Sequence, residues 1–311
     1  MPTSSTSASP PPRRVLVTGG AGFIGSRVVE ELRRRGDEVV VADLREPADA
    51  AVRHVPGDLL DPGTREKAFA DDIDAVVHLA AFTSVLRSVE EPDVCIRMNV
   101  DLTCALLELA RQRDVGTFVF ASTNAVVGDR GAEPITEDVP LHPLSPYGAT
   151  KAAGEMLLAG HAGAYGMRTC ALRFTNVYGP GMGEKDSFVP RLMRAALDGG
   201  GVEVYGDGEQ RRDLVHVDDA VQGVRLALAG DLEGTAVVGA GRSVTVNELV
   251  AAARAVTGAE IPVRHVAAKP GEMPAVVVDI GRSVARGYAP AYDLEAGLAT
   301  VWDDFRAAAA T

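Results

Sequence analysis

Short apolar runs alternate with amphipathic stretches along the first half of the chain. Runs rich in Val, Ala, Leu and Phe predict buried strands at residues 15–17, 39–42, 54–56, 75–78 and 117–121. Between them, apolar residues recur with helical spacing at residues 23–35, 64–70 and 95–113. Continuous apolar strands that alternate with amphipathic helices predict a parallel sheet whose two faces are both covered.

The second half continues this alternation and then loosens. A helix at 146–162 leads into a strand at 169–174. After Asn176 the pattern is less regular, and the predicted elements lie at 189–198, 202–205, 218–228, 246–257 and 294–305. The sequence therefore predicts an α/β protein with no internal repeat.

Two structural units follow from this pattern. We predict a Rossmann-type, doubly wound parallel sheet made of residues 13–175 with parts of 205–240. A smaller C-terminal α/β lobe, mainly residues 176–204 and 241–311, is predicted to cap the carboxyl edge of the sheet and bind substrate. Residues 1–12, rich in Ser, Thr and Pro, predict a flexible tail.

Composition narrows the class of protein. The 311 residues are 46% apolar and carry a net charge of −12, which argues against nucleic-acid or membrane partners. No apolar run is long enough to span a bilayer. The three cysteines lack metal-ligand or redox-motif spacing, so we predict free thiols in a reducing cytoplasm and no metal. His78 and His216 lie in apolar segments and are predicted to be core residues.

The first strand runs directly into a glycine-rich turn. Gly19, Gly22 and Gly25 precede a helix, which is the arrangement that brings backbone N–H groups to a pyrophosphate. Asp43 ends the second strand, 24 residues beyond Gly19, where a carboxylate can hold a ribose 2′-hydroxyl and repel a 2′-phosphate. The pattern favours NAD, and Arg45 close by keeps NADP as the alternative.

A second motif carries candidate chemistry. Tyr147 and Lys151 are four residues apart and share one face of a predicted helix. The lysine charge and the positive nicotinamide ring of bound NAD both favour the phenolate, so Tyr147 is predicted to act as a general base. Ser122 and Thr123 end the preceding strand, where a hydroxyl can bind the same substrate oxygen.

With these motifs in place, the chain resembles the extended short-chain dehydrogenase/reductase family, and within it the NAD-dependent nucleotide-sugar epimerases such as UDP-hexose 4-epimerases. The resemblance extends from Val15 to Phe305. Its ordered segments are 18–25, 57–59, 78–81, Asn99, 122–123, 147–151, 173–180, 205–213, 269–272 and 294–305.

The resemblance implies a role for each matching residue. Thr123, Tyr147 and Lys151 would form the catalytic trio. NAD would be held by Gly19, Gly22, Phe23, Ile24, Gly25, Asp43, Asp58, Leu59, Leu79, Ala80, Ala81, Thr83, Asn99, Ser122, Tyr147 and Lys151. The substrate would be held by Thr123, Asn124, Asn176, Val189, Arg212, Lys269 and Glu272.

Arg87 is a further candidate, because it follows the strand end that should face the sugar. It could recognise a 6-carboxylate, or it could be a solvated residue at a helix start. Lys269 stands where many family members have Arg, which keeps the charge but loses the bidentate fork. Val127 stands where family members usually carry Tyr.

Asn124 and Ala125 replace the Asp-Glu pair of the sugar 4,6-dehydratases, so dehydration would lack its acid and base. We therefore predict a 4-epimerase that acts on a UDP-hexose or UDP-hexuronate, such as UDP-glucose, UDP-galactose or UDP-glucuronate, through a 4-keto intermediate. N-acetylhexosamines and other nucleotides remain open. The alternatives are a 4-ketoreductase, a decarboxylase, or a non-catalytic NAD-binding sensor. The resemblance also implies a homodimer through the helices at 95–113 and 146–162.

Overall fold

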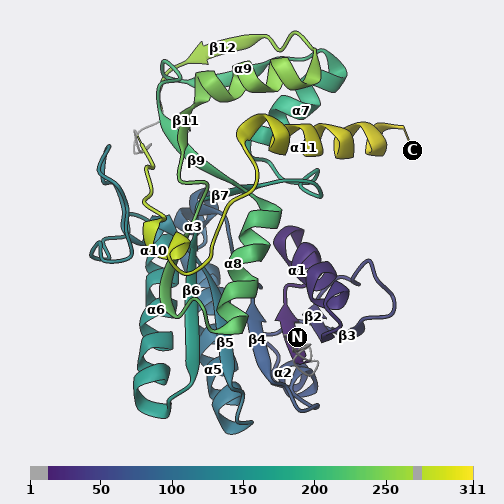
Figure 1. Cartoon of the computed structure of the whole chain (residues 1–311), viewed down its shortest axis with the longest axis vertical. Helices are drawn as coiled ribbons and strands as arrows, with labels where there is room; N and C mark the ends of the chain where they lie inside the picture. The colour runs from purple at the N-terminus through teal and green to yellow at the C-terminus, as the bar shows by residue number, and fades with distance from the viewer. Residues whose placement is uncertain (1–12, 269–274, 311) are drawn as a thin grey trace, which may run out of the picture.

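The computed structural model describes residues 13–268 and 275–310 (Figure 1). Its centre is a seven-stranded parallel sheet in the order β10-β6-β5-β4-β1-β2-β3. The strands are β1 (Arg14–Thr18), β2 (Glu38–Asp43), β3 (Arg53–Pro56), β4 (Ala75–His78), β5 (Thr117–Thr123), β6 (Arg168–Phe174) and β10 (Gly234–Val238). The predicted doubly wound sheet is confirmed.

Two groups of helices bury the two faces of this sheet. One face packs against α1 (Phe23–Arg34) and α8 (Val217–Ala229). The other packs against α2 (Pro62–Ala68), α5 (Leu102–Gln112) and α6 (Pro146–Tyr165). Because both faces are covered, strands such as β4 are buried along their whole length, which explains their continuous apolar sequence.

The helix predicted at 95–113 is present, because residues 92–112 are helical without interruption, but its repeat changes in the middle. The structure has α4 (Pro92–Ile96), a π-helical turn (Arg97–Asp101) and then α5. A π-turn inserts an extra residue into the helical repeat and often lies at a functional site. Here it carries Asn99, which is buried.

Most of the remaining elements form the region above the sheet (Figure 1). A separate apolar core joins α7 (Phe188–Asp198), α9 (Val246–Thr257) and α11 (Leu294–Ala309). Two small sheets flank it, β11-β9-β7 and β12-β8. Their strands are β7 (Asn176–Tyr178), β8 (Val202–Tyr205), β9 (Arg211–His216), β11 (Ser243–Thr245) and β12 (Val263–Val266).

Two short helices complete the fold, α3 (Val85–Glu90) after β4 and α10 (Gly281–Val284) against β10. His78 and His216 are buried, as predicted. Among the described helices, none combines the length and apolar character that a bilayer-crossing segment needs. The predicted tail and the candidates Lys269 and Glu272 lie outside the described residues.

Candidate active site

A cleft of about 1240 Å³ opens at the carboxyl edge of the large sheet. Its floor includes Gly19 after β1 and Leu79 after β4, the two neighbouring strands at which the strand order reverses. Its opposite wall comes from the upper region, with Val189 and Arg212. Ligands of doubly wound sheets bind at this switch point, and the volume exceeds that of a pocket for one small molecule.

The backbone is packed so closely at the glycine turn that a side chain could not be accommodated there. Gly19 has φ +70°, and a Cβ there would lie 2.7 Å from the Ala80 nitrogen. A Cβ on Gly25 would lie 2.0 Å from the Gly19 carbonyl oxygen. The N-cap of α1 is Gly22, and no described side chain caps this helix. The helix N-terminus therefore faces the cleft with its backbone donors, and it fits the pyrophosphate of a dinucleotide.

Asp43 sits beside this turn at the end of β2. Its carboxylate accepts hydrogen bonds from the backbone nitrogens of Ala21 and Arg45, both at 3.0 Å. The Arg45 guanidinium donates to the Ala21 carbonyl at 3.0 Å and pairs with Glu184 at 3.4 Å. Asp43 thus lies where a carboxylate can hold the ribose, and Arg45, which also lines the cleft, is bound to the same turn and to Glu184. This arrangement favours a 2′-hydroxyl over a 2′-phosphate.

Asn99 lies behind the cleft wall rather than on its surface. Its Oδ1 accepts from the Phe82 nitrogen at 2.8 Å, and its Nδ2 donates to the Phe82 carbonyl at 3.0 Å. Nδ2 also donates to Thr150 Oγ1 at 2.9 Å. Asn99 therefore clamps the segment after β4 to α6. The cleft residues Ala80, Ala81 and Thr83 belong to that segment.

The candidate catalytic trio lies where β5 meets the start of α6. Thr123 ends β5, and Tyr147 is in the first turn of α6, whose N-cap Ser145 accepts from the Gly148 nitrogen. Lys151, one turn later, is 2% exposed and still borders the cleft. Its Nζ donates to the Ala121 carbonyl at 2.9 Å. The structure thus brings the three predicted residues together.

Burial is the main influence on the pKa values of Tyr147 and Lys151. It raises the pKa of Tyr147 to about 12, against a hydrogen bond with the Thr123 side chain that favours the phenolate. It lowers the pKa of Lys151 to about 7. The sequence predicted that Lys151 and a bound nicotinamide cation would together lower the tyrosine pKa. In the protein alone that pKa rises instead, because desolvation outweighs the favourable contacts.

The predicted substrate residues divide into two groups. Asn176, Val189 and Arg212 line the cleft. Asn176 Nδ2 donates to the Asp213 carbonyl at 3.1 Å, which places this amide beside Arg212. Asp213 itself is buried and accepts from two backbone nitrogens of the loop after β10, so β9 is anchored firmly.

The second group does not reach the cleft surface. Arg87 is exposed, and its Nη2 donates to Glu91 Oε1 at 2.9 Å. It therefore behaves as a solvated helix residue and does not approach a sugar site. Asn124 follows Thr123 but is buried, and neither polar atom of its amide has a hydrogen-bond partner among the described residues.

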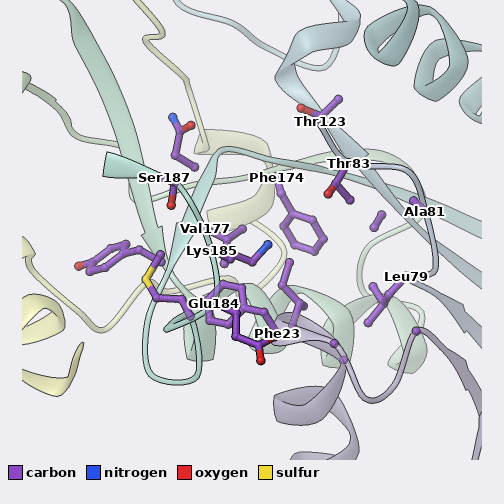
Figure 2. A pocket seen from close by; sticks show the side chains of 18 of the residues that line it. Phe23, Leu79, Ala81, Thr83, Thr123, Phe174, Val177, Glu184, Lys185 and Ser187 are labelled. Atoms are coloured by element: carbon purple, nitrogen blue, oxygen red, sulfur yellow. The ribbon is translucent and has the colours of Figure 1, made fainter. Parts of the chain in front are cut away.

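Sequence reasoning missed the segment between β7 and α7. Glu184, Lys185 and Ser187 from this segment line the cleft together with Phe174 and Val177 (Figure 2). Lys185 Nζ lies 5.2 Å from the centre of the Phe23 ring. The available signal was the glycine-rich, charged stretch that directly follows a predicted substrate residue.

A comparison with known protein families decides the assignment. Residues 15–239 match the model of the NAD dependent epimerase/dehydratase family. The chain belongs to this family. Its NAD cofactor and its Rossmann-type sheet agree with the sequence predictions.

Individual members of the epimerase/dehydratase family resemble the whole chain. A dTDP-glucose 4,6-dehydratase from Streptomyces griseus is 38% identical over 92% of each chain. The crystal structure of a Thermus thermophilus UDP-glucose 4-epimerase with NAD is 37% identical, has a TM-score of 0.89, and matches 95% of this chain and 99% of that one. MoeE5 in complex with UDP-glucuronic acid and NAD is 38% identical, with a TM-score of 0.86 and the same coverage.

Proposed function

We propose that this chain is an NAD-dependent UDP-hexose 4-epimerase. The observation that carries the proposal is the junction of β5 and α6, where a Thr-Tyr-Lys set faces a cleft large enough for two ligands. Neighbouring family members include epimerases that bind NAD. A sensor would need no base, so the intact trio favours an enzyme.

In this mechanism Tyr147 removes the proton from the C4 hydroxyl, and the Thr123 hydroxyl holds the same oxygen. NAD, when held in the cleft beside these residues, would supply the reversible hydride acceptance at C4 that inversion through a 4-keto sugar requires. Lys151 is proposed to supply positive charge to the site, and Tyr147 lies in the first turn of α6, where the helix dipole favours a phenolate. Because burial raises the tyrosine pKa in the protein alone, the nicotinamide charge is needed to complete the base.

The two residues after Thr123 support epimerisation over dehydration. A 4,6-dehydratase needs an acid for the leaving hydroxyl and a base for the C5 proton. Asn124 offers an uncharged amide and Ala125 offers no polar group. The high identity to a dehydratase therefore reflects the shared scaffold.

The upper region is proposed to hold the nucleotide part of the substrate. Arg212 and Asn176 would contact the diphosphate, and Val189 would line the same part of the cleft. Lys269 and Glu272 are proposed to contact the diphosphate and the ribose. On this view residues 13–175 and parts of 205–240 bind NAD, whereas 176–204 and 241–311 mainly bind the UDP-sugar.

The position of Arg87 bears on the sugar. Since this guanidinium is paired with Glu91 outside the cleft, it supplies no site for a 6-carboxylate. A neutral UDP-hexose is therefore the first substrate to test. A UDP-hexuronate is the second candidate, because the similar protein MoeE5 was crystallised with UDP-glucuronic acid.

The test is incubation of the purified protein with NAD and a panel of UDP-hexoses and UDP-hexuronates, followed by chromatography with mass detection. A product of unchanged mass from a UDP-hexose is expected. Loss of water or carbon dioxide would instead identify a dehydratase or decarboxylase. Tyr147→Phe should retain NAD and lose nearly all turnover, whereas Tyr165→Phe, at the exposed end of the same helix, should remain active.

We also propose a homodimer. Apolar side chains are exposed on three helices that pack together, α3, α4 and α6. They are Leu86, Val89, Ile96 and Met156, each at least 47% exposed. Exposed apolar side chains gathered on neighbouring helices are typical of an interface. Light scattering should give twice the mass of the chain, and Met156→Lys should shift it toward the monomer.

A further inference from the structure

A buried ion pair lies one helical turn beyond Lys151 on α6 and does not border the cleft. Arg173 Nη2 donates to Glu155 Oε2 at 2.8 Å, and Arg173 Nε donates to Glu155 Oε1 at 2.9 Å. The two side chains are 4% and 1% exposed. Removing two charges from water offsets most of the attraction between them, so a buried pair of this kind contributes little net stability. Another reason for its presence is needed.

The pair connects to the active site through Ser122. The Ser122 hydroxyl donates to Glu155 Oε1 at 2.5 Å. Ser122 is the residue between Ala121, whose carbonyl binds Lys151, and Thr123, whose side chain binds Tyr147. Three consecutive residues at the end of β5 are therefore each bound to α6.

The spacing on the helix makes these three contacts one unit. Tyr147, Lys151 and Glu155 follow one another at intervals of four residues and so lie along one face of α6. The contact at Glu155 is the one farthest from the helix start. It fixes the rotation of α6 about its axis and its position along β5, and the other two contacts depend on both.

Arg173 holds the carboxylate in place from the other side. In the sheet it is paired in register with Ser122. Its third nitrogen, Nη1, donates to the carbonyls of Thr136 and Glu137 at 3.4 and 3.3 Å. Every nitrogen of the guanidinium is thus engaged, and both Glu155 oxygens accept hydrogen bonds from Arg173.

This arrangement decides where the lysine points. Glu155 lies four residues after Lys151, a spacing at which opposite charges on a helix can pair. Because Arg173 occupies the carboxylate, Lys151 instead donates to Ala121, toward the cleft. Lys151 Nζ also lies 4.6 Å from the centre of the Phe120 ring, and the titratable groups near it are His78 on β4 and Cys95 on α4.

We propose that Glu155 and Arg173 are positioning residues for the epimerase reaction. They hold Ser122, and through it they keep Thr123, Tyr147 and Lys151 in register while the Glu155 charge stays away from Lys151. The inference rests on the proposed function, because it assigns these residues to the same catalytic trio.

The decisive variant replaces both charges at once. Glu155→Gln with Arg173→Met leaves no unpaired buried charge, so it is expected to fold and retain NAD. We expect kcat for the UDP-hexose to fall about 100-fold, since a small displacement of catalytic groups costs this much. KM should stay within about threefold, because the groups that bind the nucleotide are untouched. A folded, NAD-loaded double variant with wild-type kcat would overturn the proposal.

A milder pair of variants guards against misfolding. Ser122→Ala removes the hydroxyl that links β5 to Glu155, and Ser283→Ala removes an equally buried hydroxyl that donates to Val237 far from the cleft. Ser122→Ala should lower kcat by about tenfold with little change in KM. Ser283→Ala should affect only stability. Equal kcat values for the two serine variants would contradict the proposal.

Failure of the two proposals can be told apart. If the wild type converts no UDP-sugar, the proposed function is wrong, and the positioning role is then judged from a crystal structure of the double variant. There we expect the Thr123 and Tyr147 hydroxyls beyond hydrogen-bonding distance, or Lys151 turned away from Ala121. An unchanged arrangement of the three residues would refute the positioning role whatever the substrate.

Discussion

The buried ammonium of Lys151 makes a prediction about stability that is independent of the substrate. Lys151 is 2% exposed, and burial lowers its pKa from the ordinary 10.5 to about 7. The folded protein therefore binds this proton less tightly than the unfolded chain does. We expect Lys151→Met, which keeps the length and apolar character of the side chain, to stabilise the NAD-free protein.

The magnitude follows from linkage. With pKa values of 10.5 unfolded and about 7 folded, the lysine charge costs about 4 kcal/mol of unfolding free energy at pH 7 and about 2 kcal/mol at pH 9. The cost decreases from pH 7 to pH 9 because the pH approaches the pKa of the lysine in the unfolded chain. Loss of the hydrogen bond to Ala121 offsets about 1–3 kcal/mol. At pH 7 the variant should be about 1–3 kcal/mol more stable than the wild type.

Urea unfolding of the NAD-free wild type and variant at pH 7 and pH 9 measures this difference. The advantage of the variant should shrink by about 2 kcal/mol at the higher pH. Lys67→Met, on the exposed surface of α2, is the matched control and should change stability by less than about 0.5 kcal/mol at both pH values. A difference between Lys151→Met and wild type that is the same at both pH values would refute the reasoning.

Three further predictions concern the glycine turn, the buried histidines and a helix cap. Gly25→Ala should raise the dissociation constant of NAD about 100-fold, because its Cβ would collide with the backbone of the turn. Calorimetry measures this constant, and an unchanged value would exclude the turn as the pyrophosphate site. Burial lowers the pKa of His78 to about 3 and that of His216 to about 4, so stability should fall below pH 6.5 by about 2.5 kcal/mol per unit near pH 5. His78→Gln should remove about half of this dependence of the unfolding free energy on pH, measured by urea unfolding at several pH values. An unchanged dependence on pH would show that His78 does not cause it. Thr245→Ala should cost about 1 kcal/mol because it breaks a capping box, whereas Ser187→Ala, at an N-cap without a side-chain hydrogen bond, should cost little; equal losses in thermal unfolding would argue against the cap.

The large sheet could be predicted because its signals are local. The run at 39–42 is apolar at every position, and the glycines that follow β1 report a turn with no room for side chains. Tyr147 and Lys151 were found because one helix carries both. Each of these features depends on residues that are close in sequence.

Features that depend on distant partners could not be predicted. The π-turn between α4 and α5 contains Asn99, which binds Phe82 and Thr150 from other parts of the chain. Among the short strands of the upper region, β8 was predicted at 202–205, whereas β7, β11 and β12 carry too few residues to show a period. For Arg87, a local signal did exist: Glu91, four residues later, is the partner that holds its guanidinium outside the cleft.

The course of the chain after residue 175 limits how this protein can be rebuilt. Having entered the upper region, it returns to place α8 on the face shared with α1 and β10 at the edge of the large sheet, and then leaves again. A chimera made with a single crossover at residue 175 would therefore exchange an edge strand and a covering helix along with the sugar site. To transfer the sugar preference of a relative, an engineer would need to replace the segments around β7–α7 and β11–α9 separately and leave α8 and β10 in place.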